Sequence, residues 1–398
     1  MGNLNRMVAG YAAPTLVTGQ RRILGFEKPA DIEAGVTAVL SPASYGSFGD
    51  EGMIQGSRDS IVAASGKAQL FTPGPVEPWT AMGVTGVRSI DGIIALGRMH
   101  MDARKLRRLT RAERMVVLGA DSIDGAYGIR SISQRVSLLN VAAAQGRRAE
   151  LANFSFRRNP SSDALTALRR LDKRVRLTAR DKNSQRRATE ALQRAVGVFP
   201  DVAAYMKPGQ SAVIDSLRAW VAGRDRPVVV LVPNAHLAAF DGTGYKEVAR
   251  RFQAYMVALL DAGFAVVVLP HDVREKPGDI AMSEQLMVGM PHDDVMLAVP
   301  RNAQEAKGML SLADVVVTAR MHAGVAALSQ GVPCVGLDYV DKFAGQFQWY
   351  GAEQFVVAWE DNPKPHLVAE LSRLALSQAG NAHPSTPDFV KAPPPWLR

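Results

Sequence analysis

The sequence predicts an α/β protein with two doubly wound domains of parallel strands. Short β-branched runs of strand length alternate with helical segments in both halves of the 398-residue chain. The clearest strand–helix–strand unit spans residues 314–339, and its helix is stopped by Gly331 and Pro333. Open sheets of this kind bind ligands where the strands end, so we expect the active site in a cleft between the domains.

The composition is typical of a globular protein in a reducing compartment. Hydrophobic residues make up 47% of the chain, which is enough for a sizeable core. Apolar runs have the length of strands and fall short of the roughly 20 residues of a membrane span, and the N-terminus lacks the apolar core of a signal peptide. The single cysteine, Cys334, cannot form an internal disulfide. We therefore expect a cytoplasmic protein.

The formal net charge of +9 comes largely from arginine-rich runs between residues 98 and 187. These runs lack the interleaved aromatic residues of single-strand nucleic-acid binders, and no helix-turn-helix, zinc-finger or RRM pattern is present. We therefore expect no nucleic-acid partner. Solvated helix faces are the first explanation of the charge. An anionic substrate or a peripheral contact with the inner face of a membrane is the second.

Strands and helices alternate along both halves of the chain. A boundary zone at residues 207–226 suggests an N-terminal domain at 1–215 and a second domain at 216–360. Residues 361–398 then hold a helix and a proline-rich tail, which we expect to be loosely ordered from residue 379. The expected strands are 36–40, 115–118, 152–156, 175–178, 228–232, 265–269, 295–299, 314–318 and 334–339. The main expected helices are 131–145, 164–170, 244–262, 303–312, 322–330 and 365–378.

Arg320 and His322 stand where a strand ends and a helix begins, in the segment TARMHAG. The N-terminus of a helix favours an anion, and arginine adds a bidentate fork for carboxylate or phosphate. Histidine exchanges protons near neutral pH. The pattern therefore indicates a site for an anionic substrate that also needs proton transfer, although a sheet-edge arginine and an ordinary helix residue would give the same pattern.

Three further segments follow expected strands. The first is a glycine-rich loop with Gly49, Asp50 and Glu51, which allows close backbone approach before a helix that starts near Met53. The second is GADSIDGAY, where Asp121 and Asp124 could accept a proton or merely form a turn. The third contains His271, which could face the cleft or bond the backbone of its turn. The D-x-x-D spacing has no further ligands beside it, so we predict no metal.

These motifs, taken together, resemble those of polysaccharide pyruvyl transferases. The resemblance covers roughly residues 36–350 through four motifs in the family's order. They are the G-x-x-GDE loop ending at Glu51, GAD-x-x-DG-x-Y ending at Tyr127, R-D-x-x-S at 180–184, and Arg320-Met321-His322-Ala323 with Gly331-x-Pro333, Tyr339 and Lys342. The first motif departs from the family pattern, because Ser47 stands where asparagine is usual.

The resemblance implies a fold, a reaction and a set of site residues. The fold is the two-domain GT-B type, and the reaction moves the enolpyruvyl unit of phosphoenolpyruvate onto a sugar as a pyruvate ketal, with no separate cofactor. His322 is the expected acid, and Asp121 or Asp124 is the expected base for a sugar hydroxyl. The expected substrate-binding residues are Arg320, Arg180, Met321, Gly49, Asp50, Glu51, Tyr127, His271 and Lys342.

Two other functions stay open at this point. One is a GT-B nucleotide-sugar glycosyltransferase, although such enzymes often show an acidic residue for ribose where this chain has Arg320. The other is a non-catalytic binder of anionic glycans, which would need no acid at His322. A Rossmann dehydrogenase is disfavoured because no GxGxxG opens a helix after a strand.

Overall fold

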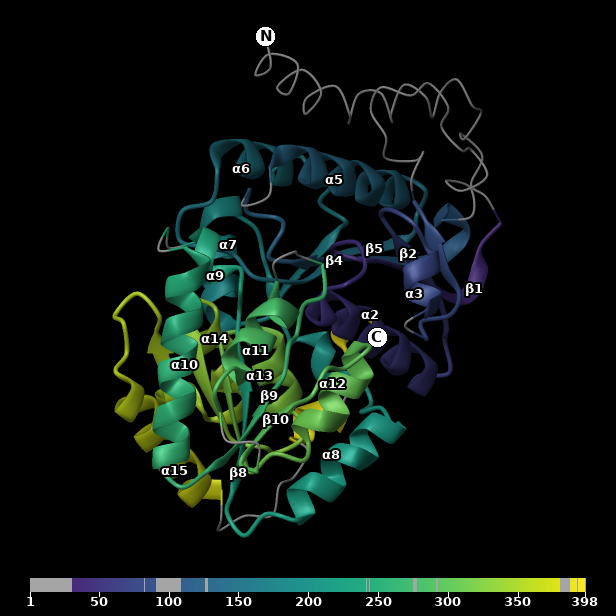
Figure 1. The fold of residues 1–398 in the computed structure, drawn as a ribbon. Coiled ribbons are helices and arrows are strands. Elements are labelled where there is room, and N and C mark those ends of the chain that lie inside the picture. The colour runs from purple at the N-terminus through teal and green to yellow at the C-terminus, as the bar shows by residue number, and fades with distance from the viewer. Residues whose placement is uncertain are drawn as a thin grey trace. The chain divides into compact units, whose positions relative to one another are not determined.

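A computed structural model describes residues 31–81, 83–90, 109–125, 128–240, 242, 244–274, 278–290, 293–379, 387–391 and 393–397. The chain forms two compact units, shown in Figure 1. The first unit holds the described residues of Met1–Ser44, Ser57–Asp201 and Pro393–Arg398, and the second those of Tyr45–Gly56 and Val202–Ala392. The glycine-rich loop of the N-terminal half is therefore part of the second unit.

The first unit contains a seven-stranded parallel sheet in the order β3-β2-β1-β4-β5-β6-β7. The chain starts at β1 and winds outward in both directions, so the order reverses between β1 and β4, as in a doubly wound fold. The strands are β1 (Glu33–Leu40), β2 (Lys67–Thr72), β3 (Val87–Ser89), β4 (Ala112–Ala120), β5 (Arg148–Phe154), β6 (Arg176–Ala179) and β7 (Gly197–Val198).

Helices of the first unit connect successive parallel strands. Ser161 and Asp181 start two of them, because their side-chain oxygens accept hydrogen bonds from the backbone N–H groups of Ala164 (3.1 Å) and Ser184 (2.7 Å). The aspartate and serine of the R-D-x-x-S motif thus form a helix cap. The helices are α2 (Phe48–Ala63, shared by both units), α3 (Glu77–Ala81), α5 (Ile129–Ala144), α6 (Ser162–Leu168) and α7 (Lys182–Leu192), with the 3₁₀ turn η4 (Pro395–Leu397).

The second unit contains a six-stranded parallel sheet in the order β10-β9-β8-β11-β12-β13. Its central strands are apolar except for Thr318 because helices cover both faces of such a sheet, and every residue of β8, β9 and β11 is buried. The strands are β8 (Val228–Val232), β9 (Ala265–Val268), β10 (Val295–Leu297), β11 (Val315–Thr318), β12 (Cys334–Asp338) and β13 (Val356–Ala358).

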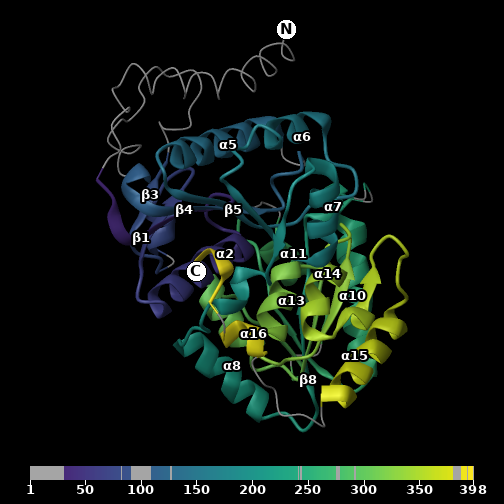
Figure 2. The same ribbon diagram turned by 180° about the vertical axis from the view of Figure 1, so that it is seen from behind.

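The helices of the second unit pack on this sheet, and α10 and α15 lie side by side in both views (Figures 1 and 2). The helices are α8 (Ala212–Ala222), α9 (Leu237–Phe240), α10 (Tyr245–Asp261), α11 (Asp279–Met287), α12 (Ala303–Leu310), α13 (Met321–Leu328), α14 (Phe343–Phe347), α15 (Pro365–Ala379) and α16 (Asp388–Lys391). The 3₁₀ turns are η1 (Val202–Tyr205), η2 (Gln348–Tyr350) and η3 (Glu353–Phe355). No helix in the described ranges is long and apolar enough to span a membrane.

The structure confirms the predicted pair of doubly wound parallel sheets and corrects several local expectations. Strands β2 and β3 were not predicted, and the predicted boundary after residue 215 falls inside α8. Helix α2 begins at Phe48, five residues before its expected start. The C-terminal tail is not loose where the structure describes it: Trp396 is 1% exposed, and the Tyr205 hydroxyl donates to the carbonyl of Phe389 at 2.7 Å.

Candidate functional site

Polar residues follow three neighbouring strands of the second sheet at the edge where each strand ends. Asn234 follows β8, His271 follows β9, and Arg320 follows β11. Because all strands are parallel, these residues share one edge of the sheet. Strands β8 and β11 flank the point where the strand order reverses, which is where open α/β sheets bind ligands. This edge is therefore the candidate site.

Arg320 is held at the turn between β11 and α13 by its backbone and by its side chain. Its N–H donates to the Thr318 hydroxyl at 2.9 Å, and that hydroxyl donates to the Arg320 carbonyl at 3.0 Å. The hydrogen bonds of Thr318 thus fix the turn that places Arg320 at the N-terminus of an eight-residue helix. The N–H groups of that first helical turn make the position favourable for an anion.

The Arg320 guanidinium makes a two-pronged ion pair with Asp279, with Nε–Oδ2 at 2.9 Å and Nη2–Oδ1 at 2.6 Å. Its Nη1 lies 3.5 Å from Oδ2 of Asp272. Burial opposes the positive charge, but the two carboxylates outweigh it and raise the pKa of Arg320. The side chain is 16% exposed, so Arg320 is a permanently charged group held in one orientation.

Asp279 and Asp272 form the support for Arg320, and neither was predicted from the sequence. The Asp279 carboxylate accepts hydrogen bonds from the N–H groups of Ala235 (2.9 Å) and His271 (3.3 Å), so it joins the β8 and β9 loops to Arg320. Burial opposes ionisation of Asp272, but Arg274 and Arg320 lower its pKa below the usual value. Asp272 directly follows the predicted His271, whereas Asp279 gives only the common signal of an acid in a first helical turn.

The glycine-rich loop runs along the segment after β9. The Gly46 carbonyl accepts from Val273 N–H at 2.9 Å, and Phe48 N–H donates to the His271 carbonyl at 3.4 Å. Gly46 has a φ of +96°, and a Cβ there would lie 2.3 Å from Cγ of Arg274. The backbone can make this approach only because the residue is glycine.

Asp50, at the start of α2, lies near Arg274, a charged residue of the segment after β9. Its Oδ2 lies 3.8 Å from Nη1 of Arg274, which also makes a two-pronged pair with Asp272 through Nε (3.1 Å) and Nη2 (2.7 Å). Arg274 was not predicted as part of the site. It links the carboxylate that supports Arg320 to the start of α2.

Gly49 lies directly against the imidazole of His322. A Cβ on Gly49 would lie 2.3 Å from Nδ1 of His322, well inside van der Waals contact. His322 is the second residue of α13 and is half-buried, so its ring is supported on one side and is not sealed from solvent. The predicted loop glycine and the predicted acid thus meet in the second unit.

His271 is a packing residue of this edge. It is 5% exposed, and its ring meets Phe48 in an edge-on arrangement with centroids 5.6 Å apart. Burial, together with the charges of Arg320 and His322, lowers the pKa of His271 to about 3. The ring is therefore neutral near pH 7, and its predicted contact with substrate stays a prediction.

Glu51 is fully buried. Its Oε2 accepts a hydrogen bond from the N–H of Ala303, at the start of α12, at 3.1 Å. Oε1 has no hydrogen-bond partner within the part of the chain that the structure describes. Burial raises the pKa of Glu51 to about 8. Its contacts make it a link between α2 and α12, and its predicted role in substrate binding stays a prediction.

Met321 and Lys342 complete the predicted set at this edge. Met321 is the half-buried first residue of α13. Lys342 is the N-terminal cap residue of α14, and its N–H donates to Oδ2 of Asp338 at 3.0 Å. Eight of the predicted residues therefore belong to the second unit: Gly49, Asp50, Glu51, His271, Arg320, Met321, His322 and Lys342.

Asp121, Asp124 and Arg180 belong to the first unit. Asp121 and Asp124 follow β4, as predicted, and Asp121 is half-buried. The Asp124 side chain is fully buried and pairs with Nε of Arg157 at 3.0 Å. Tyr127 lies outside the described residues. Among the residues that the structure describes, no three His, Cys, Asp or Glu side chains are placed to hold a metal ion.

Arg180 is buried in a hydrogen-bonded ion pair. Its side chain is 1% exposed, Nη1 lies 2.9 Å from Oδ2 of Asp201, and Nε donates to the Ser155 hydroxyl at 2.8 Å. These contacts join the end of β6 to the segments that follow β5 and β7 in the first unit. They account for Arg180 as a structural residue, and its predicted grip on an anion stays a prediction.

Comparisons with known proteins indicate the family to which this chain is related. Residues 104–341, more than half of the chain, match the family model described as polysaccharide pyruvyl transferase. No curated protein sequence matches the chain.

Several solved structures are similar in fold. A glycosyltransferase from Rickettsia africae is 8% identical with a TM-score of 0.52, covering 89% of this chain and 96% of its own. The UDP-GlcNAc 2-epimerase from Methanocaldococcus jannaschii is 10% identical with a TM-score of 0.52, covering 88% and 95%. That from Neisseria meningitidis, bound to UDP-GlcNAc, is 11% identical with a TM-score of 0.50, covering 89% and 97%. These similarities concern the fold alone, and they agree with the predicted GT-B-like pair of Rossmann-like domains.

Proposed function

Because the chain belongs to the polysaccharide pyruvyl transferase family, we propose that it transfers pyruvate from phosphoenolpyruvate to a sugar, as a ketal. The observation that carries this proposal is the pair of groups at the start of α13. Arg320 is a fixed cation there, and His322 is a half-buried histidine two residues later. An anionic donor that must be protonated on carbon needs both kinds of group.

The charges around Arg320 decide how a donor would bind. Two arginines, Arg274 and Arg320, face three carboxylates, Asp50, Asp272 and Asp279, which leaves one surplus negative charge. We infer that these carboxylates orient the arginines and do not themselves contact the donor. The carboxylate and phosphate of the donor would then be held by the N–H groups of the first turn of α13, by the outer edge of Arg320 and by protonated His322.

His322 is the proposed acid. In its protonated form it would donate a proton to the methylene carbon of phosphoenolpyruvate, which leaves the neighbouring carbon electron-poor. The oxygen of one sugar hydroxyl bonds to that carbon while its proton passes to a carboxylate base. The carbon–oxygen bond to phosphate then breaks with its electron pair, the second hydroxyl closes the ketal, and its proton restores His322. The proton on the base leaves with the phosphate.

Asp121 is the better candidate for the base. The carboxylate of Asp124 is fully buried and already paired with Arg157, which disfavours it as a proton acceptor for a sugar. Asp121 is half-buried, so substrate can reach it more readily. The acceptor is proposed to be a sugar of a cell-envelope polysaccharide or glycolipid, reached from the cytoplasm, with attachment to a lipid as one form that it can take.

Ligand-induced stabilisation tests the donor. A ligand that binds only the folded protein raises its melting temperature. We expect phosphoenolpyruvate to do so, and UDP, GDP and NAD not to. Arg320→Lys should reduce the shift because lysine lacks the planar fork. A shift with UDP or GDP in place of phosphoenolpyruvate would overturn the proposal in favour of a nucleotide-sugar glycosyltransferase of the same fold.

A second variant tests the acid. His322→Gln should reduce the shift with phosphoenolpyruvate without abolishing it, because Arg320 and the start of α13 remain, but it should lower phosphate release in the presence of an acceptor sugar by about 10²–10⁴-fold. His366→Gln is the matched control, because His366 is an exposed histidine on α15 of the same unit. Full turnover by His322→Gln would contradict the assignment of the acid while leaving the donor site in place.

A further inference from the structure

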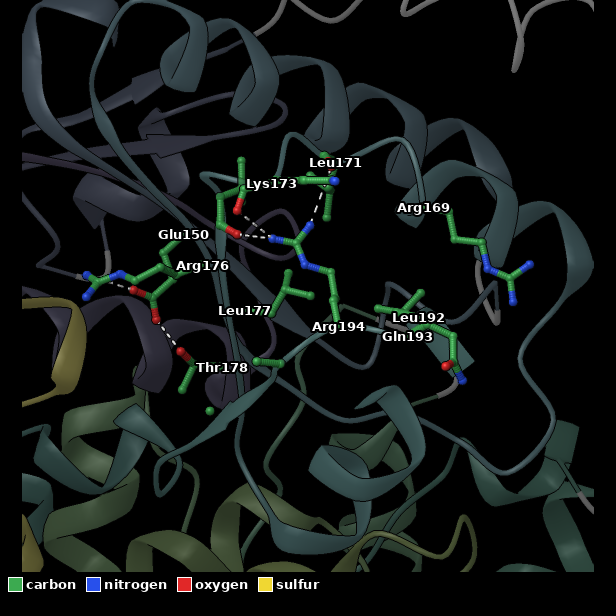
Figure 3. Close-up of a pocket in the computed structure, with 13 residues that line it drawn as sticks. Glu150, Arg169, Leu171, Lys173, Arg176, Leu177, Thr178, Leu192, Gln193 and Arg194 are labelled. Carbon is green, nitrogen blue, oxygen red and sulfur yellow. Dashed lines mark hydrogen bonds and ion pairs between the residues drawn. The ribbon is translucent and has the colours of Figure 1, made fainter. Parts of the chain in front are cut away.

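The first unit has a pocket of about 700 Å³ at the edge of its sheet where the strands begin (Figure 3). This edge is opposite to the carboxyl edge, where Asp121 and Asp124 follow β4. The volume of the pocket lies within the range of about 300–1,000 Å³ for small-molecule sites. The pocket is lined by Glu150, Arg169, Leu171, Lys173, Val175, Arg176, Leu177, Thr178, Leu192, Gln193, Arg194, Ala195 and Gly197.

Apolar side chains from the core of the unit form part of the lining. Leu171, Val175, Leu177 and Leu192 are each at most 7% exposed and belong to one hydrophobic cluster. Among the described residues, none that lines the pocket is aromatic. A nucleobase would therefore find no ring to stack on, whereas an aliphatic chain would find a matching surface.

The same pocket carries a surplus of positive charge. Four of its lining residues are cations, namely Arg169, Lys173, Arg176 and Arg194, and one is a carboxylate, Glu150, which leaves a surplus of three. Arg176 pairs with Glu150 at 3.2 Å, at the side of the pocket that also holds Thr178 (Figure 3). Asp172, next to the lining, is paired with Arg174 at 2.6 Å and also attracts Arg194, so it offsets part of the charge of Arg194.

Hydrogen bonds to backbone carbonyls orient two of these arginines without adding a counter-charge. Arg194 donates to the backbone carbonyls of Leu171, Asp172, Lys173 and Val175, and Arg169 donates to that of Ala191 at 2.8 Å. These carbonyls lie near helix ends and in the turn before β6, and they carry no net charge. The Lys173 ammonium makes no hydrogen bond or ion pair with any residue that the structure describes. A bound anion would therefore balance part of the positive charge of the pocket.

We propose that this pocket binds a phosphorylated lipid. The phosphate would lie against Lys173 and Arg194, which are neighbours in Figure 3, whereas Arg169 lies apart from them, and the aliphatic chain would lie on the leucine and valine side chains. An uncharged sugar would make no ion pair with the cations, and a small anion would make no contact with the apolar surface. This site lies in a different unit from Arg320 and does not depend on the pyruvyl chemistry.

Isothermal titration calorimetry on the full chain with geranyl monophosphate, a short prenyl phosphate, tests the proposal, with inorganic phosphate and geraniol as separate arms. We expect geranyl monophosphate to bind more tightly than either fragment. Lys173→Glu should weaken it by at least about tenfold, because a charge-assisted contact is replaced by repulsion. Arg186→Glu is the matched control, since Arg186 is an exposed arginine of α7 outside the pocket lining.

Three results would overturn the proposal. Equal binding of phosphate and geranyl monophosphate would mean that the apolar surface is unused, and equal binding of geraniol would mean that the cations are unused. Absent binding, or equal loss in Lys173→Glu and Arg186→Glu, would remove the pocket as the site. The melting temperature of each variant checks that it is folded, and an unchanged shift with phosphoenolpyruvate keeps the outcome separate from that of the donor site.

Discussion

The position that a Cβ of Gly49 would occupy lies 2.3 Å from Nδ1 of His322. Gly49 is the second residue of α2 and has an ordinary φ, so its backbone does not require glycine. On intrinsic propensity alanine would be preferred there by roughly 1 kcal/mol. The glycine is therefore explained by the imidazole packed against it.

Replacing Gly49 by alanine should displace His322. We expect Gly49→Ala to lower the free energy of unfolding by about 1–3 kcal/mol, because the added methyl group overpacks the contact, and to lower transfer activity further. Urea unfolding and phosphate release would measure the two effects. Gly223→Ala is the control, since a Cβ there meets no atom closer than 3.5 Å and φ is −83°. Unchanged activity in Gly49→Ala would show that the position of His322 is not critical.

The Arg320–Asp279 pair should be strongly coupled to folding. Asp279→Asn leaves a largely buried guanidinium without its main counter-charge, so we expect a loss of about 3–5 kcal/mol. Asp215→Asn removes an exposed pair with Arg218 and should cost less than about 1 kcal/mol. Chemical denaturation of both variants provides the comparison. Similar small losses would mean that Arg320 does not depend on Asp279 for its placement.

Arg180 should behave as a structural residue of the first unit. Arg180→Met removes the ion-pair partner of the buried Asp201 carboxylate, and we expect a loss of stability of about 3–5 kcal/mol. The shift in melting temperature with phosphoenolpyruvate should persist below the new transition. Arg186→Met, on an exposed arginine, should change neither quantity. Loss of the phosphoenolpyruvate shift in Arg180→Met alone would instead identify Arg180 as a donor ligand.

Glu51 should make the stability of the second unit fall as pH rises. Its pKa is about 8 when folded and 4.5 ordinarily, so the folded protein retains a proton between these values that the unfolded chain releases. This contribution is fully present below pH 4.5 and is lost as pH rises through about 8. Its full size is on the order of 5 kcal/mol.

Glu51→Gln removes this dependence while keeping an acceptor for Ala303. The melting temperature of Glu51→Gln relative to wild type should therefore increase from pH 5 to pH 9. Glu190→Gln, at a residue whose side chain is 64% exposed, should show a difference that does not vary with pH. A constant difference for Glu51→Gln would show that the buried carboxyl does not titrate in this range.

The sequence by itself determined the fold class, two doubly wound parallel sheets, and the location of the chemical groups along the chain. Continuous valine runs such as β11 predict strands buried on both faces, and Gly331 with Pro333 predicts the end of α13. Parallel strands bring their carboxyl ends to one edge, so Arg320 and His271 were correctly placed at strand ends. These inferences depend on local periodicity and capping, which act over a few residues.

Only the tertiary structure decided which of these groups meet and what each is free to do. Asp279 is 41 residues from Arg320, and Gly49 is far from His322 in sequence, so neither contact has a local signal. Burial also determines what single side chains can do. It raises the pKa of Glu51 so that this carboxyl is neutral near pH 7, and it encloses Arg180 in an ion pair with Asp201. The physical reason is that desolvation and pairing depend on long-range packing, whereas residue type and spacing are the same whether a side chain is buried or exposed.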